Sequence, residues 1–158
     1  MERGSTLFLK IAVILIGVPV LALGIFGLYW FVNHPANPDY APILYPILIG
    51  IYVTIIPFFT ALYQAFKLLS YIDKNQAFSN LSVKALKNIK FCAVSITGLY
   101  VLMMPFVFLV AEMDDAPGLI LISLIPPFAS LVIAIFAAVL QRLLQEAIHI
   151  KSENDLTV

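Results

Sequence analysis

The stretch ILYPILIGIYVTIIPFFTALYQAFKLL, residues 43–69, contains no charged side chain before Lys67. An α-helix rises 1.5 Å per residue, so about 20 apolar residues cross the roughly 30 Å hydrocarbon core of a bilayer. Three further apolar stretches, at about residues 11–32, 89–111 and 118–144, are also long enough. The sequence therefore predicts an all-α, polytopic membrane protein with four transmembrane helices in an antiparallel bundle.

Composition agrees with a chain that is mostly membrane-embedded. Hydrophobic residues make up 62% and charged residues 11% of the chain, against roughly 45–50% and about 25% in soluble domains. The 158 residues are used up by the four spans and their links, so we expect a single four-span domain over residues 1–158. The first apolar run exceeds the 7–15 residues of a signal-peptide core, which favours a retained anchor.

The basic residues are sorted between the two sides of these spans. The connections at residues 33–42 and 112–117 contain no Lys or Arg, although they contain several acids. All nine basic residues lie in the N-terminal segment, in or beside the connection at residues 70–88, or toward the C-terminus: Arg3, Lys10, Lys67, Lys74, Lys84, Lys87, Lys90, Arg142 and Lys151. Because cytoplasmic loops are enriched in Lys and Arg, we expect both termini to be cytoplasmic (N-in/C-in) in a bacterial plasma (inner) membrane. The bases stay close to span ends, so no direct contact with nucleic acid is expected.

The cytoplasmic connection at residues 70–88 contains a helix-start pattern. Ser79 could cap the amides of Leu81 or Ser82, with Phe78 packing on Val83, so a helix should begin near Asn80 and run into the third span. Along this helix three lysines recur at three-residue intervals: Lys84, Lys87 and Lys90. Anchoring to an anionic lipid leaflet is one interpretation, and docking of an acidic partner is the other. Phe78, Ser79, Asn80 and the three lysines are thus the candidate partner or lipid contact.

The outer links supply a second candidate site. Glu112, Asp114 and Asp115 are close in sequence and could contact an outer ligand, either a divalent cation or a cationic peptide. A solvated turn is the simpler interpretation of the same acids.

The spans lack the residues that most membrane chemistry requires. No Asp, Glu, Lys, Arg or His lies in the middle of any span, whereas proton pumps, ion-coupled carriers and voltage sensors place ionisable groups there. Paired catalytic groups at membrane depth are also missing, so we predict no enzyme, no cofactor and no metal.

Prolines occur in every span, and they are usually tolerated in membrane helices. The consecutive pair Pro126-Pro127 is the exception, because it predicts a local bend. The small residues Ser130, Ala134 and Ala138 on the same span could pack within the bundle or form a homo-oligomer.

The segment YIDKNQAFSNLS, residues 71–82, continues through Lys87 and Lys90 into the third span. With four spans and a short tail, it resembles the bacterial membrane family known as domain of unknown function 2975. Members of that family show a Gly/Asn-x-x-Phe-Ser-x-Asn motif between spans two and three; here the corresponding residues are NQAFSNL, residues 75–81, with Leu81 in place of the last Asn. The resemblance implies a bacterial plasma-membrane location. It also implies a regulatory or sensing role, since genes of this kind often sit beside a small helix-turn-helix regulator.

These observations favour a non-enzymatic accessory or regulatory protein of the membrane. It would sense membrane state or a small ligand and signal through its cytoplasmic face to a regulator or a membrane partner protein. Self-immunity against a membrane-active peptide, using the outer acids, is the alternative. A small transporter or channel subunit is a further alternative, disfavoured by the uncharged spans.

Overall fold

The computed structural model of the protein describes residues 2–35 and 37–156. The ends of the predicted domain, residues 1 and 157–158, lie outside this description together with residue 36. The helices are α1 (Glu2–Asn33), α2 (Ala41–Asp73), α3 (Asn80–Met113), α4 (Gly118–Ser123) and α5 (Ile125–Leu156). Four helical segments are long and apolar enough to cross a membrane: residues 6–33, α2, α3, and the stretch Gly118–Leu156 that contains α4 and α5. The predicted all-helical class is confirmed, and each predicted span falls within one of these four segments.

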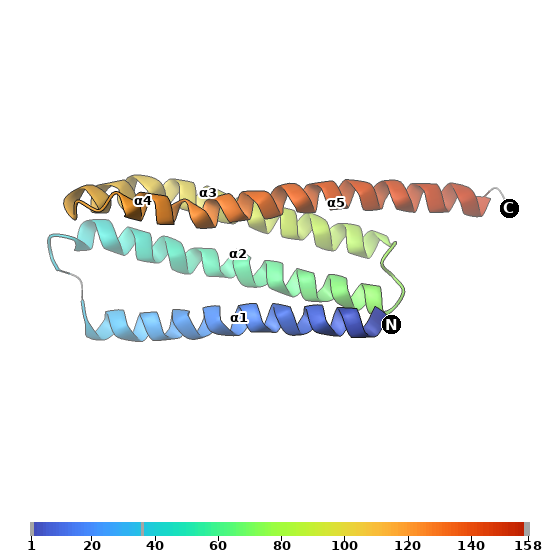
Figure 1. Ribbon diagram of the computed structural model, residues 1–158, viewed down its shortest axis with the longest axis horizontal. Coiled ribbons are helices and arrows are strands. Elements are labelled where there is room, and N and C mark those ends of the chain that lie inside the picture. Colours follow the sequence, from blue (N-terminus) through green and yellow to red (C-terminus); the bar gives the residue numbers. More distant parts are fainter. Residues whose placement is uncertain (1, 36, 157–158) are drawn as a thin grey trace.

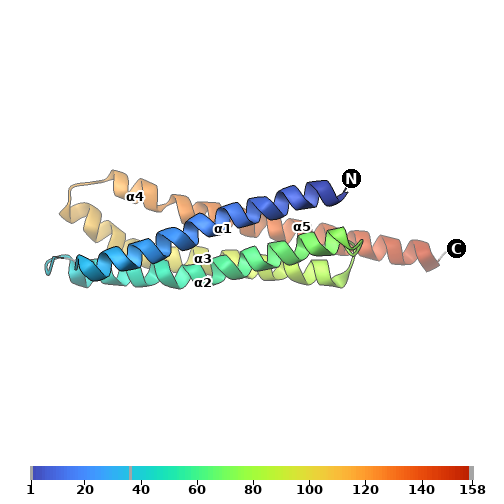
Figure 2. The ribbon, with the colours of Figure 1, turned by 90° about the horizontal axis from the view of Figure 1, so that it is seen from below.

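The four spans form an open row. Helix α2 packs along α3 and α3 along α5, while α1 approaches only α2 among the described residues. Figure 1 shows α1, α2 and α3 lying side by side, with both termini at the same end of the molecule. In Figure 2, α1 crosses the neighbouring helices at an angle. Because α1 and α5 do not approach each other, the row is not closed into a ring of four helices.

The turn between α2 and α3 is a Schellman motif, in which a left-handed residue ends the helix. The amide of Gln76 donates to the carbonyl of Tyr71, at 2.7 Å, and the amide of Asn75 donates to that of Ile72, at 3.1 Å. Asn75 between them has a φ of 59°. Asn tolerates this left-handed backbone better than most residues, so the sequence Lys74-Asn75 ends α2 sharply and lets the chain reverse.

Helix α3 begins at Asn80 as predicted, with Ser79 as the residue before it, but the predicted side-chain cap is wrong. The Ser79 hydroxyl donates to the carbonyl of Gln76, at 2.5 Å, and not to an amide of the first turn of α3. The hydroxyl of Ser82, whose residue is fully buried, donates to the same carbonyl, at 3.1 Å. The Schellman turn brings the Gln76 carbonyl close to the start of α3, where it accepts both hydroxyls. The Phe78 side chain, which was predicted to pack on Val83, is 57% exposed.

The same motif ends α3 at the other end of the molecule. The amide of Ala116 donates to the carbonyl of Ala111, at 2.8 Å, and Asp115 has a φ of 51°. Two of the three sharp reversals in the chain therefore depend on a non-glycine residue in the left-handed region.

The prolines of the first three spans do not interrupt their helices, since Pro19, Pro57 and Pro105 all lie inside continuous α-helix. The fourth span breaks at Leu124, between α4 and α5. Pro126 and Pro127 lie in the first turn of α5 and have no amide hydrogen to donate to the preceding turn. The helix is thus interrupted two residues before the pair at which the sequence predicts a bend.

Helix α5 continues well past the other helices (Figure 1). Residues 149–156 are all exposed, and the pairs Arg142–Glu146 and His149–Glu153 lie one turn apart on the helix surface, at 3.8 and 3.1 Å. The predicted short tail is therefore a helical extension.

Replacing Asn75 tests the role of its backbone conformation. We expect Asn75→Ala to lower the free energy of unfolding by about 1 kcal/mol, because a Cβ without a polar side chain is disfavoured in the left-handed region. Asn75→Gly should be neutral or stabilising, because glycine adopts this conformation freely. Thermal unfolding in detergent measures both, with the neighbouring exposed Lys74→Ala as control. Equal stabilities of the Ala and Gly variants would contradict the assignment.

Candidate functional site

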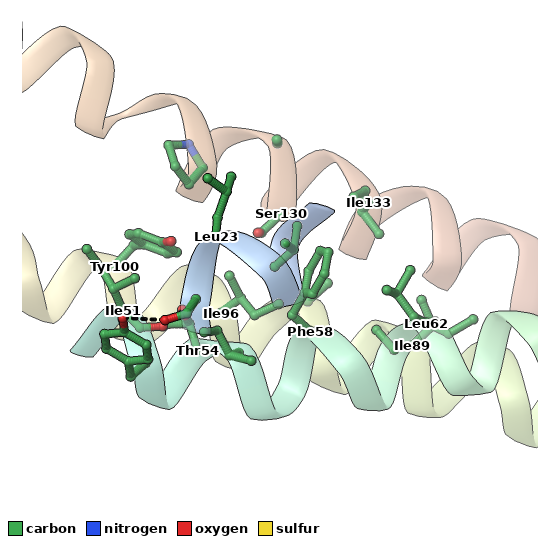
Figure 3. A pocket seen from close by; sticks show the side chains of 18 of the residues that line it. Leu23, Ile51, Thr54, Phe58, Leu62, Ile89, Ile96, Tyr100, Ser130 and Ile133 are labelled. Atoms are coloured by element: carbon green, nitrogen blue, oxygen red, sulfur yellow. Dashed lines mark hydrogen bonds between the residues drawn. The ribbon is translucent and has the colours of Figure 1, made fainter. Parts of the chain in front are cut away.

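A cavity of about 640 Å³ lies at the middle of the spans, within the range typical of small-molecule sites. Helices α1, α2, α3 and α5 all contribute to its walls (Figure 3). Its side chains are almost all apolar: Val20, Leu23, Gly24, Leu48, Ile51, Tyr52, Thr54, Ile55, Phe58, Ala61, Leu62, Ala65, Ile89, Ala93, Ile96, Tyr100, Pro126, Ala129, Ser130 and Ile133. Because α1 and α5 make no backbone contact, we infer that the cavity opens between them.

The polar groups of the cavity are all hydroxyls. Thr54 donates to the carbonyl of Ile51, at 2.5 Å, and Tyr52 donates to the carbonyl of Gly24, at 2.8 Å. The hydroxyls of Tyr100 and Ser130 face the cavity (Figure 3). No charged residue lines the cavity, so the site can receive a neutral apolar molecule without burying an unpaired charge.

Polar contacts at two levels hold α1, the peripheral wall of the cavity, against α2. In mid-span, the hydroxyl of Tyr52 donates to the carbonyl of Gly24 on α1, at 2.8 Å. At the end near the N-terminus, Lys10 forms an ion pair with Asp73, at 2.7 Å, and each of the two side chains is only 21% exposed. The hydroxyl of Thr6 donates to the other carboxylate oxygen of Asp73. The Lys10 ammonium also lies over the ring of Phe66, at 5.4 Å from its centroid.

The inner candidate residues divide into two groups. The Ser79 hydroxyl donates its hydrogen to the Gln76 carbonyl in the turn that starts α3, so it can contact a partner only as an acceptor. Phe78, Asn80, Lys84 and Lys87 are exposed, and Lys90 is half-buried. The ammonium groups of Lys87 and Lys90 lie 5.9 and 5.0 Å from the centroid of the exposed Phe91 ring. This aromatic and basic surface at one end of α3 is compatible with either lipid headgroups or an acidic partner.

The outer acids have structural roles that the sequence analysis did not foresee. Asp115 is the left-handed residue that ends α3. Asp114 accepts a hydrogen bond from the hydroxyl of Tyr40, at 2.7 Å, and thereby joins the two outer links. This hydrogen bond and the charge of Asp114 raise the pKa of the Tyr40 phenol, with smaller contributions from desolvation and from Asp39. Only Glu112 of the three acids has neither of these roles.

Sequence analysis missed the residues that matter most for this site. Lys10 was considered only as one of the bases near the span ends, and Asp73 was not considered, although an acid among these bases indicates an ion pair. Tyr52 and Tyr100 were not singled out, although hydroxyls in apolar spans need partners. Among the described residues, no group of three or more His, Cys, Asp or Glu side chains is placed to hold a metal ion.

Comparisons with known proteins agree with this architecture. The model of a family described as "Protein of unknown function (DUF2975)" matches residues 30–158. The chain is 64% identical over 160 residues to "Uncharacterized membrane protein YoaS" of Bacillus subtilis (strain 168), and the match covers all of both chains. No solved structure matches the chain. The resemblance carried by residues 71–90 is thereby confirmed, and the chain belongs to the DUF2975 family of membrane proteins.

Proposed function

We propose that the protein is a non-enzymatic sensor in the bacterial plasma membrane that takes up a lipophilic molecule and signals through its cytoplasmic face. The observation that carries this proposal is the cavity at mid-span, which is lined by apolar side chains and lies between two helices, α1 and α5, whose backbones do not contact each other. A molecule dissolved in the bilayer reaches such an opening by lateral diffusion, without crossing water. Nothing at the cavity resembles a catalytic constellation, since its polar groups are isolated hydroxyls.

The topology that we propose is N-in/C-in. Two observations support it: the outer links carry no basic residue, and both termini lie at the same end of the molecule as the turn between α2 and α3 (Figure 1). This end holds Lys74, Lys84 and Lys87, so the positive-inside rule orients it toward the cytoplasm. The Lys87–Phe91 and Lys90–Phe91 contacts then lie at the level of the inner headgroups.

Accessibility to a thiol reagent tests this topology. In a Cys92→Ala background, single cysteines at Asn37 and Glu112 should react with a membrane-impermeant maleimide added to intact cells. Cysteines at Lys74 and Ser152 should react only after the cells are opened. All four positions are exposed on the protein. A cysteine that fails to react is therefore protected by the membrane and not by burial within the protein. Labelling of Lys74→Cys in sealed cells would refute the N-in/C-in arrangement.

The cavity is connected to the cytoplasmic face through two routes. Helix α1 forms one wall, and its inner end is bound to Asp73, the last residue of α2 before the Schellman turn. Helix α5 forms another wall through Pro126, Ser130 and Ile133 and continues without interruption to Leu156. A ligand that moves α1 or α5 therefore changes the inner turn or the projecting end of α5. A cytoplasmic regulator or a membrane partner protein that contacts Phe78, Lys84 and Lys87 would receive this change.

Amide exchange in two lipid environments tests this coupling. We expect the backbone amides of residues 6–12 and 73–82 to exchange their hydrogens more slowly in nanodiscs of native bacterial lipid extract than in nanodiscs of one synthetic phospholipid. The physical reason is that occupation of the cavity restrains α1, whose inner end is bound to Asp73.

A cavity-blocking variant is the control for this measurement. Ala129→Phe fills the cavity and should abolish the difference between the lipids. Ile135→Phe adds a ring on the same helix outside the cavity and should preserve it. Identical exchange of the unmodified protein in both lipids, or an unchanged response in Ala129→Phe, would contradict the proposed function.

A further inference from the structure

Two hydroxyls of the cavity have no hydrogen-bond partner among the residues that the structure describes. They belong to Tyr100 on α3 and Ser130 on α5, two half-buried residues whose hydroxyls open onto the cavity (Figure 3). A hydroxyl that faces hydrocarbon without a partner is unfavourable, because lipid tails cannot replace the hydrogen bond to water. An apolar acyl chain in the cavity would leave both groups unpaired.

The other hydroxyls of the spans show that this arrangement is unusual within the chain. Most Ser and Thr side chains in the helices donate to a carbonyl three or four residues earlier in the same helix: Thr54, Thr60, Ser70, Ser95, Thr97 and Ser123. Ser130 is turned into the cavity and makes no such bond. Among the tyrosines, Tyr52 on α2 lines the same cavity but donates to Gly24.

The position of these hydroxyls limits the chemistry of a ligand. Tyr100 and Ser130 lie close to the centres of the apolar stretches at residues 89–111 and 118–144, at the depth of the bilayer midplane. Phospholipid headgroups and ester groups stay near the interface, about 15 Å away, since the hydrocarbon core is roughly 30 Å thick. The absence of Lys, Arg and His from the lining leaves no counter-ion for a carboxylate. The matching ligand is therefore neutral and carries hydrogen-bond acceptors within an otherwise apolar body.

We propose that the cavity binds a neutral lipophilic carbonyl compound of the quinone class, whose oxygens accept hydrogen bonds from Tyr100 and Ser130. A para-quinone has carbonyl oxygens on opposite edges of a flat ring, and these two donors belong to different helices. The ring of Phe58 supplies an aromatic surface within the cavity (Figure 3). The cavity extends along α2 from Leu48 to Ala65, roughly 25 Å at 1.5 Å per residue, which leaves room for an apolar tail. This inference rests on the proposed function and names the ligand class of the same site.

Binding of a defined probe tests the inference. The full-length protein in nanodiscs of one synthetic phospholipid is titrated with a decyl-substituted para-benzoquinone and, separately, with decylbenzene, which has a similar body without acceptors. Native mass spectrometry after release from the nanodisc measures the retained probe. We expect saturable binding of the quinone that is at least tenfold tighter than that of decylbenzene. Loss of one hydrogen bond in Tyr100→Phe or Ser130→Ala should weaken quinone binding about five- to tenfold.

Matched variants separate this recognition from general effects on the bundle. Tyr63→Phe and Ser95→Ala remove hydroxyls of the same kinds outside this cavity and should leave quinone binding unchanged. Equal retention of the two probes, or unchanged quinone binding in both Tyr100→Phe and Ser130→Ala, would overturn the assignment of a carbonyl ligand. The exchange response to native lipids and its loss in Ala129→Phe would still stand in that case. Failure of that response as well would refute the proposed function itself.

Discussion

Among the described residues, helix α1 contacts the rest of the molecule through α2 alone, and Asp73 holds its N-terminal end. Within a bilayer, apolar helices gain little by leaving lipid for one another, so close packing and polar contacts decide how they associate. The ion pair with Lys10 and the hydrogen bond from Thr6 both converge on Asp73, where each member of the ion pair is largely shielded from solvent. Together with the Tyr52–Gly24 hydrogen bond, these contacts determine where α1 lies.

The cavity is a consequence of this one-sided attachment. Helix α5 packs on α3, at the opposite end of the row from α1, and no contact closes the space between α1 and α5. The break at Leu124 lies two residues before Pro126, which is part of the cavity wall. The same two helices that bound the opening also lead to the end of the molecule that carries Asp73, the Asn75 turn and the projecting part of α5. The proposed sensing role follows from this continuity between a membrane-depth site and one end of the bundle.

The helices themselves could be predicted because hydrocarbon admits few alternatives: long apolar runs must satisfy their backbone hydrogen bonds internally. The start of α3 at Asn80 was also predictable from local residues. The side-chain cap was not predictable. The Ser79 hydroxyl can bond either to an amide in the first turn of α3 or to the preceding Gln76 carbonyl, and the geometry of the turn places the carbonyl within reach. The cavity could not be predicted either. It depends on contacts between residues 28 and 63 positions apart, Tyr52 with Gly24 and Lys10 with Asp73, which no local pattern reveals. The structural roles of Asp114 and Asp115 could not be predicted, because neither the left-handed turn nor the contact with Tyr40 is visible in the sequence.

Disulfide cross-linking in native membranes tests the central claim that α1 is joined to α2 and separated from α5. In a Cys92→Ala background, Gly24→Cys is combined either with Ile55→Cys on α2 or with Ile133→Cys on α5, and copper-phenanthroline is added. A disulfide requires Cα atoms within about 7 Å, and no Cα of α1 lies within 8 Å of one in α5. The account predicts that the pair with Ile55→Cys cross-links, since the Gly24 side-chain position is 3.5 Å from the Ile55 side chain. The pair with Ile133→Cys should remain reduced. Efficient cross-linking of Gly24→Cys to Ile133→Cys would mean that the cavity is closed in the bilayer and would contradict the account.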